Sequence, residues 1–295
     1  VGADTGAMDD QGRTALFLAL SAGYQPLVEV LAKQKQGAQG QGGGIFTKDK
    51  SGLTPLHQAA SRGTLDTVQF LLGEGAEVNS SNSGGWTPLH AACSGGHVAV
   101  AQYLVEVGAD VHARDSNQYT ALHWAANVAT ATFLVDQGAD IHAKNLQGMT
   151  PFTRACLGGK KETAAYLVGI MLVGGPDEKV QGLDKTVMEH HTFNGETPLH
   201  LALKSGCTAA VHTMLGRGVN VSVPSARDRL TGMDAMFAYG ALSIAADLIH
   251  ANPMAAASRT PSTYGQQPKS KLGTAREAGS WGERLECARQ YVQLV

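Results

Sequence analysis

Residues 52–60 read Gly-Leu-Thr-Pro-Leu-His-Gln-Ala-Ala, and a close copy, Gly-Trp-Thr-Pro-Leu-His-Ala-Ala-Cys, fills residues 85–93. The phrase returns in weaker form with its threonine at Thr120, Thr150 and Thr197. From the first copy onward, successive threonines are 33, 33, 30 and 47 residues apart. Recurrence near every 33 residues is typical of stacked supersecondary units, so the sequence predicts a repeat architecture.

Each copy of the phrase has the chemistry of a helix start. Thr54 is a good N-cap, because its hydroxyl accepts a hydrogen bond from an otherwise unpaired amide of the first turn. Pro55 follows at the first helical position, where the missing N–H costs nothing. His57, at the third position, is placed to hydrogen-bond back toward the cap. Gly63 closes this short helix, and a second apolar helix then ends at the polar turn 75–79.

The combination Thr-Pro-Leu-His-x-Ala-Ala-x-x-Gly, a second apolar helix and Gly-Ala-Asp-Val-x-Ala resembles the ankyrin repeat. The resemblance covers nearly the whole chain. It implies an all-α solenoid of helix-turn-helix repeats joined by short β-hairpin loops. It also implies that the hairpin tips and the inner helices form one concave surface, to which a partner protein binds.

We expect seven repeats within residues 1–250. The stretch 1–4 aligns with 107–110, so the array begins inside a repeat, and we expect the chain to be a fragment or to have lost an upstream part. A seven-residue Gly/Gln-rich insertion falls near 34–47, and fourteen extra residues fall near 170–193. The second insertion could contain a short helix. Repeat four lacks three residues, close to one helical turn, so we expect shortened helices or a lost turn there.

The C-terminal part departs from the pattern. Residues 251–271 are rich in polar residues and proline and predict a polar loop. Residues 272–295 keep a weak Leu-Ala-Gly spacing and continue into an amphipathic helix. The last unit of a solenoid needs a polar outer face, and Glu283, Arg284 and Arg289 would supply it. We interpret 272–295 as a degenerate capping repeat.

Composition favours a soluble protein with a large core. The chain has 295 residues, is 43% hydrophobic and carries a formal net charge of −2. The weak charge argues against nucleic-acid binding. The longest apolar run, 164–173, is too short to cross a bilayer, so we expect no membrane insertion. Four cysteines, two of them at small buried positions, favour reduced thiols and a cytoplasmic or nuclear location. We expect a monomer.

Histidines recur once per repeat, but their spacing argues against a shared metal. A whole repeat layer separates neighbouring cap histidines, so they could not reach one ion at about 2 Å. We therefore favour structural capping over metal binding, although the pair His190-His191 could bind a metal adventitiously. No nucleotide-binding or hydrolase motif is present. The sequence predicts no catalytic residues, no cofactor, no metal and no enzyme activity. The cap histidines are His57, His90, His123 and His200.

Candidate binding residues come from one column of the repeats. The position before each capping threonine holds a large apolar residue in four consecutive repeats: Leu53, Trp86, Tyr119 and Met149. Such residues are enriched in interface hot spots. The alternative is that each packs on the next hairpin and only tiles the loops. Arg62, Asn127 and Lys204, from the inner helices, would lie beside this column. We interpret Trp124 as core filler for repeat four rather than as an additional anchor.

These features predict a non-catalytic scaffold or adaptor that binds a partner protein on its concave face. The sequence does not identify the partner. The alternative is a targeting or regulatory domain of a larger enzyme or channel. Two modification sites are further hypotheses: Asn79, in a hairpin where ankyrin-like asparagines are sometimes hydroxylated, and Thr260, which precedes a proline.

Overall fold

The computed structural model of the protein describes residues 6–33, 45–173, 192, 194–227, 229–241 and 243–245. It separates into two compact units, 1–171 and 172–295. Several predictions concern residues outside the described ranges. They are most of the first insertion, the extra helix in the second, the polar loop 251–271, the capping repeat 272–295, His190, His191 and Thr260.

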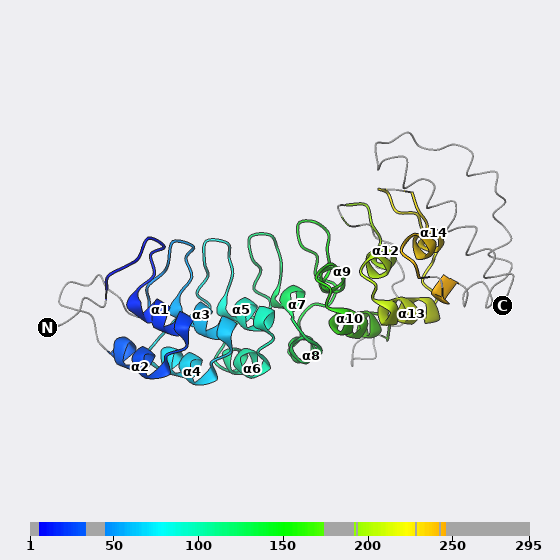
Figure 1. Cartoon of the computed structure of the whole chain (residues 1–295). Coiled ribbons are helices and arrows are strands. Elements are labelled where there is room, and N and C mark those ends of the chain that lie inside the picture. Colours follow the sequence, from blue (N-terminus) through cyan, green and yellow to red (C-terminus); the bar gives the residue numbers. More distant parts are fainter. Residues whose placement is uncertain are drawn as a thin grey trace, which may run out of the picture. The chain divides into compact units, whose positions relative to one another are not determined.

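The first unit consists of consecutive pairs of short antiparallel helices that form two rows (Figure 1). An inner row contains α1 (Ala15–Ala22), α3 (Pro55–Arg62), α5 (Pro88–Gly95), α7 (Ala121–Trp124) and α9 (Pro151–Leu157). An outer row contains α2 (Gln25–Lys33), α4 (Leu65–Gly73), α6 (Val98–Glu106), α8 (Val128–Asp136) and α10 (Lys161–Val173). Each inner helix packs on the inner helix of a neighbouring repeat, and α1, α3, α5 and α7 also pack on their own outer helices. The second unit contains α12 (Pro198–Lys204), α13 (Thr208–Gly216) and α14 (Gly232–Ala238).

The inner helices begin as the repeated phrase predicts. Thr54 is the N-cap of α3, Pro55 lies at its first position, and His57 completes a capping box. The helix ends at Gly63, which has φ 75°. That left-handed conformation is open to glycine at little cost. In the degenerate repeat seven, the carboxylate of Asp234 takes the place of the histidine and accepts from the backbone N–H of Thr231 at 2.9 Å.

The core consists of two stacked columns of apolar side chains, one from each row. Burying each such side chain contributes about 1.5–3 kcal/mol. Cys93 and Cys156 lie in small buried positions beside these columns and form no disulfide, as predicted. The inner-row column contains Leu16, Leu56, Leu89, Leu122 and Phe152, and the outer-row column Val28, Leu71, Leu104, Leu134 and Leu167.

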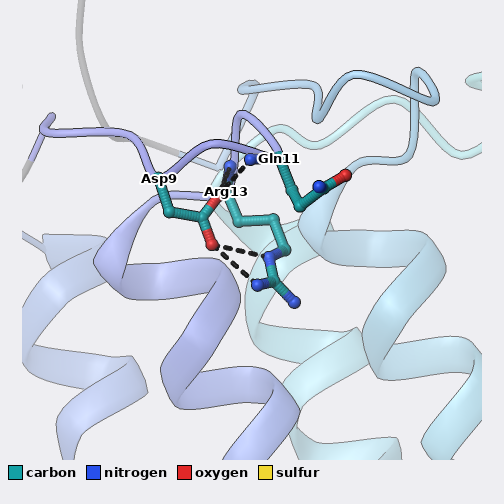
Figure 2. Close-up of polar contacts among 3 residues, drawn as sticks. All are labelled: Asp9, Gln11 and Arg13. Atoms are coloured by element: carbon teal, nitrogen blue, oxygen red, sulfur yellow. Dashed lines mark hydrogen bonds and ion pairs between the residues drawn. The ribbon is translucent and has the colours of Figure 1, made fainter.

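The loops between repeats are closed by one recurring polar side chain. In repeat one, Oδ1 of Asp9 accepts from the backbone N–H groups of Gln11 and Arg13, both at 2.9 Å (Figure 2). Oδ2 of Asp9 also pairs with the Arg13 guanidinium at 2.7 Å. The hydrogen bonds that Arg13 donates to this carboxylate, first from its side chain and then from its backbone, hold the pKa of Asp9 below its usual value. The same two backbone bonds recur at Asp49, Asn82, Asp115 and Asn145.

Neighbouring loops are also bonded to each other. The backbone N–H of Ser83 donates to the carbonyl of Ser51 at 3.1 Å, and that of Ser116 donates to Gly84 at 2.8 Å. Among the described residues the loops contain isolated β-bridges, such as Arg114 with Thr120, and no strand of a sheet. The predicted hairpins are therefore turn-closed loops stacked side by side.

Repeat four shows the predicted shortening. Its inner helix α7 has only four residues, whereas α8 keeps nine, the length of the other outer helices α4 and α6. The lost turn leaves carbonyl groups at the end of α7 without helical partners. Lys160, from repeat five, donates its ammonium to the carbonyls of Trp124 and Ala125, both at 3.1 Å. The helix α10 continues to Val173, past residue 170, where the second insertion was expected to begin.

Candidate interaction surface

The predicted apolar column is not uniformly exposed. Leu53, Trp86 and Tyr119 are half-buried, whereas Met149 is only 7% exposed. The ring of Trp86 packs on its own cap histidine, His90, with ring centroids 5.3 Å apart. The first three residues therefore remain available to a partner in part, and the side chain of Met149 belongs to the protein interior.

Trp124 brings two members of the column together. Its indole meets the ring of Trp86 edge-on at 4.7 Å and the ring of Tyr119 at 5.3 Å. Trp124 is half-buried, so it is not part of the core that we expected it to fill. The equivalent position of repeat three holds the much smaller Ala91. We call Trp86, Tyr119 and Trp124 the aromatic cluster.

A cation lies on the aromatic cluster. Cζ of Arg154 is 4.7 Å from the centroid of the Trp124 ring and 6.0 Å from that of Tyr119. A guanidinium in this position is attracted by the electron-rich ring faces. Our sequence reasoning missed Arg154. A signal was present, because Trp124 and Arg154 both lie four residues after the capping threonine of their repeats.

The cap histidines also form hydrogen bonds to the backbone of the following repeat. The backbone N–H of Thr54 donates to Nδ1 of His57 at 3.2 Å, so Nδ1 is unprotonated and the proton lies on Nε2. Nε2 then donates to the carbonyl of Trp86, in the next repeat, at 2.9 Å. Equivalent bonds between a cap histidine and the following repeat join His90 to Tyr119, His123 to Met149 and His200 to Leu230.

Burial favours the neutral form of His57, His90 and His123. It lowers the pKa of His57 and His90 below the usual value, and it lowers the pKa of His123 to about 4. Hydrogen bonds to the carbonyls of the following repeat act in the opposite direction but do not outweigh the desolvation. The structure thus confirms the capping role predicted for the histidines and adds a second role as inter-repeat links.

Two predicted binding residues have structural partners. The side-chain oxygen of Asn127 caps α8 by accepting from the N–H of Thr130 at 2.9 Å, and its amide donates to the carbonyl of Gly96 at 3.0 Å. In the second unit, the ammonium of Lys204 pairs with the buried carboxylate of Glu196 at 2.9 Å. Arg62 is exposed near the end of α3.

Asn79, the predicted hydroxylation site, is exposed and has both polar atoms engaged. Its amide donates to the carbonyl of Gly108 at 3.0 Å, and its side-chain oxygen accepts from the N–H of Asp110 at 2.9 Å. Modification at this asparagine stays a prediction. Within the described ranges, no group of three or more His, Cys, Asp or Glu side chains is placed to hold a metal ion. No helix in those ranges is long and apolar enough to cross a membrane.

The recurring pattern matches a known family. A family model described as ankyrin repeats (3 copies) matches residues 1–82, 56–145 and 127–225. Together these matches extend over the first 225 residues of the chain. No curated protein is similar enough to count as a match.

Proposed function

Because the chain belongs to the ankyrin-repeat family, whose members generally act as protein-interaction modules, we propose that it is a non-catalytic scaffold or adaptor. The partner protein binds on the concave face formed by the loops and inner helices. Leu53, Trp86, Tyr119 and Arg62 contribute from the residues selected by sequence, and Trp124 joins them. Met149 is buried, and Asn127 and Lys204 already have partners within the protein, so we propose no direct contact with the partner protein for these three residues.

The observation that carries this proposal is the aromatic cluster. Three large aromatic side chains, from two consecutive repeats, contact one another while remaining half-buried. Aromatic anchors of this kind give large contact area at low entropic cost, and they dominate the energy of many interfaces. Hydrogen bonds from His90 and His123 to neighbouring repeats hold the supporting backbone in place, so a partner would meet a preorganised surface.

A comparison of two variants in a pull-down tests the proposal. The cluster variant combines Trp86→Ala, Tyr119→Ala and Trp124→Ala. A matched control combines Phe46→Ala and Val107→Ala, two exposed apolar residues outside the cluster. Circular dichroism checks that both are folded. We expect a defined protein to be captured by the wild-type chain and the control but lost with the cluster variant. Capture of the same proteins by all three chains would overturn the proposal.

We also propose that the protein is a monomer in the cytoplasm or nucleus. The three described cysteines are buried and form no disulfide, and burial raises the pKa of the Cys93 thiol to about 12. Such thiols are stable in a reducing compartment. Light scattering on the purified chain tests the oligomeric state, and microscopy of the tagged protein tests the location.

A further inference from the structure

Positive charge gathers at one edge of the aromatic cluster. The guanidinium of Arg154 lies over Trp124, and Lys160 from the same repeat ends at the carbonyl groups of α7. The pKa of Lys160 is lowered mainly by burial and, second, by the positive charge of Arg154, so the two cations lie close enough to interact. This edge of the aromatic cluster therefore carries two cations, although the whole chain has a net charge of −2.

No carboxylate of the described chain neutralises Arg154. Arg154 takes no part in the ion pairs of Arg13 with Asp9 and of Lys204 with Glu196. Asp115, in the loop that carries Tyr119, already accepts two backbone hydrogen bonds through Oδ1. Arg154 thus has ring faces on one side and no acidic partner on the other.

A second group at this surface is also incompletely bonded. The indole Nε1 of Trp124 is buried and has no acceptor within the described part of the chain. A buried donor without an acceptor destabilises the folded chain. An oxygen of a partner that reached this atom would supply the missing acceptor. Two hydrogen-bond donors therefore lie at the Trp124 ring: the charged guanidinium of Arg154 over its face and the neutral Nε1 of the indole itself.

We propose that the aromatic cluster and Arg154 together bind an extended acidic peptide segment of the partner protein. A carboxylate of the peptide pairs with Arg154, and an adjacent apolar side chain packs on Trp86 and Tyr119. The planar guanidinium suits this task, because it can stack on a ring and still present two parallel N–H groups to a carboxylate. This inference rests on the proposed function and specifies the chemistry of its partner.

Charge complementarity favours an acidic peptide over a nucleic acid. Nucleic-acid binding needs many phosphate contacts and a broad basic field. Here the basic edge is formed by Arg154 and Lys160, and the ammonium of Lys160 is already engaged by two carbonyl oxygens. One guanidinium beside an aromatic surface matches one carboxylate beside an apolar residue.

The test is a selection of random twelve-residue peptides displayed on phage, carried out on the full wild-type chain. The affinities of the selected peptides are then measured for the wild type, Arg154→Gln, Arg154→Lys and the cluster variant. Arg217→Gln removes one exposed positive charge from the second unit and serves as the matched control. Circular dichroism confirms folding of each chain. Peptides with Asp or Glu changed to Asn or Gln provide the complementary test.

We expect selected peptides to be enriched in Asp or Glu next to an apolar residue. Arg154→Gln should weaken their binding about tenfold, Arg154→Lys should retain part of it, and Arg217→Gln should have no effect. Higher salt should weaken binding to the wild type more than to Arg154→Gln. Peptides without acidic enrichment, or equal binding by Arg154→Gln, would overturn the acidic partner, as would a selection with no binder. If such peptides bind the wild type but not the cluster variant, the proposed binding function of the aromatic cluster stands and only the acidic nature of the partner is rejected.

Discussion

Nε2 of His123 lies 3.0 Å from the carbonyl oxygen of Met149, so a side chain of repeat four is bonded to the loop of repeat five. The other ring nitrogen of His123 accepts from the backbone N–H of Thr120 at 3.1 Å. One buried ring therefore stabilises a helix start and an inter-repeat contact at the same time. Repeat stability and interface stability, the two terms that govern solenoids, are linked at this residue.

Replacing His123 should separate those two terms. His123→Ala removes both hydrogen bonds and should lower the free energy of unfolding by about 2–4 kcal/mol. His123→Thr should cost only about 1–2 kcal/mol, because a hydroxyl can keep the cap bond. Repeat five shows how: Oγ1 of Thr153 accepts from the N–H of Thr150 at 2.8 Å. Urea unfolding measures the difference, with the exposed His112→Ala as control. Equal losses for both His123 variants would contradict a separate inter-repeat bond.

Acid should destabilise the array through the same histidines. The pKa of His123 is about 4 in the folded chain and about 6.5 when unfolded, so below pH 6.5 the unfolded chain binds more protons. Protonation of Nδ1 would remove the acceptor for Thr120. The contribution of His123 is complete above pH 6.5, and about 3 kcal/mol of it should be lost by pH 4. His57 and His90 act in the same direction.

Unfolding measured from pH 7 to pH 4 checks this dependence. The loss of stability on acidification should be smaller in His123→Thr than in the wild type, because threonine does not titrate. Identical pH profiles for the two chains would show that His123 does not control acid sensitivity.

Lys160 should hold the shortened repeat four in place. Its ammonium bonds two carbonyls that the lost helical turn leaves open, at Trp124 and Ala125. Lys160→Met keeps most of the aliphatic side chain but removes these bonds, and we expect a loss of about 1–3 kcal/mol. Hydrogen exchange should show faster opening of α7 and α8 in Lys160→Met than in the wild type. The control Lys144→Met changes an exposed loop residue and should leave this exchange unchanged. Unchanged exchange in Lys160→Met would mean that water replaces the ammonium.

The loop side chains should tolerate loss of charge but not loss of the oxygen. Asp115 accepts from the N–H groups of Asn117 and Tyr119, and asparagines make the same bonds in repeats three and five. Asp115→Asn should therefore change stability by less than about 0.5 kcal/mol. Asp115→Ala should cost about 2 kcal/mol, because two backbone donors lose their acceptor. Thermal unfolding of both variants measures the contrast, and a costly Asp115→Asn would show that the negative charge itself matters.

The fold could be predicted from the sequence because its determining contacts are local and repeated. The bond from His57 back to the cap spans three residues, and the glycine that ends α3 acts through its own backbone. Such contacts leave the same letters at the same spacing in every repeat. The shortening of repeat four could be predicted for the same reason, because three missing residues remove close to one turn wherever the repeat is placed.

The candidate surface was only partly predictable, because its geometry depends on contacts between repeats. Sequence alone places Trp86 and Tyr119 in one column, but it does not show that the Trp124 ring contacts both of them. Arg154 contributes through a side-chain rotamer that lies over the rings of another repeat.

Local chemistry therefore determined the family, the helix starts and ends, the loop acceptors and the capping role of the histidines. The tertiary structure decided which side chains remain available to a partner. It buried Met149, engaged Asn127 and Lys204 with partners of their own, and brought Arg154 onto Trp124. The physical reason is range: a cap acts within one turn of its own helix, whereas exposure and stacking depend on side chains that lie about 30 residues apart in the chain and meet only when neighbouring repeats stack.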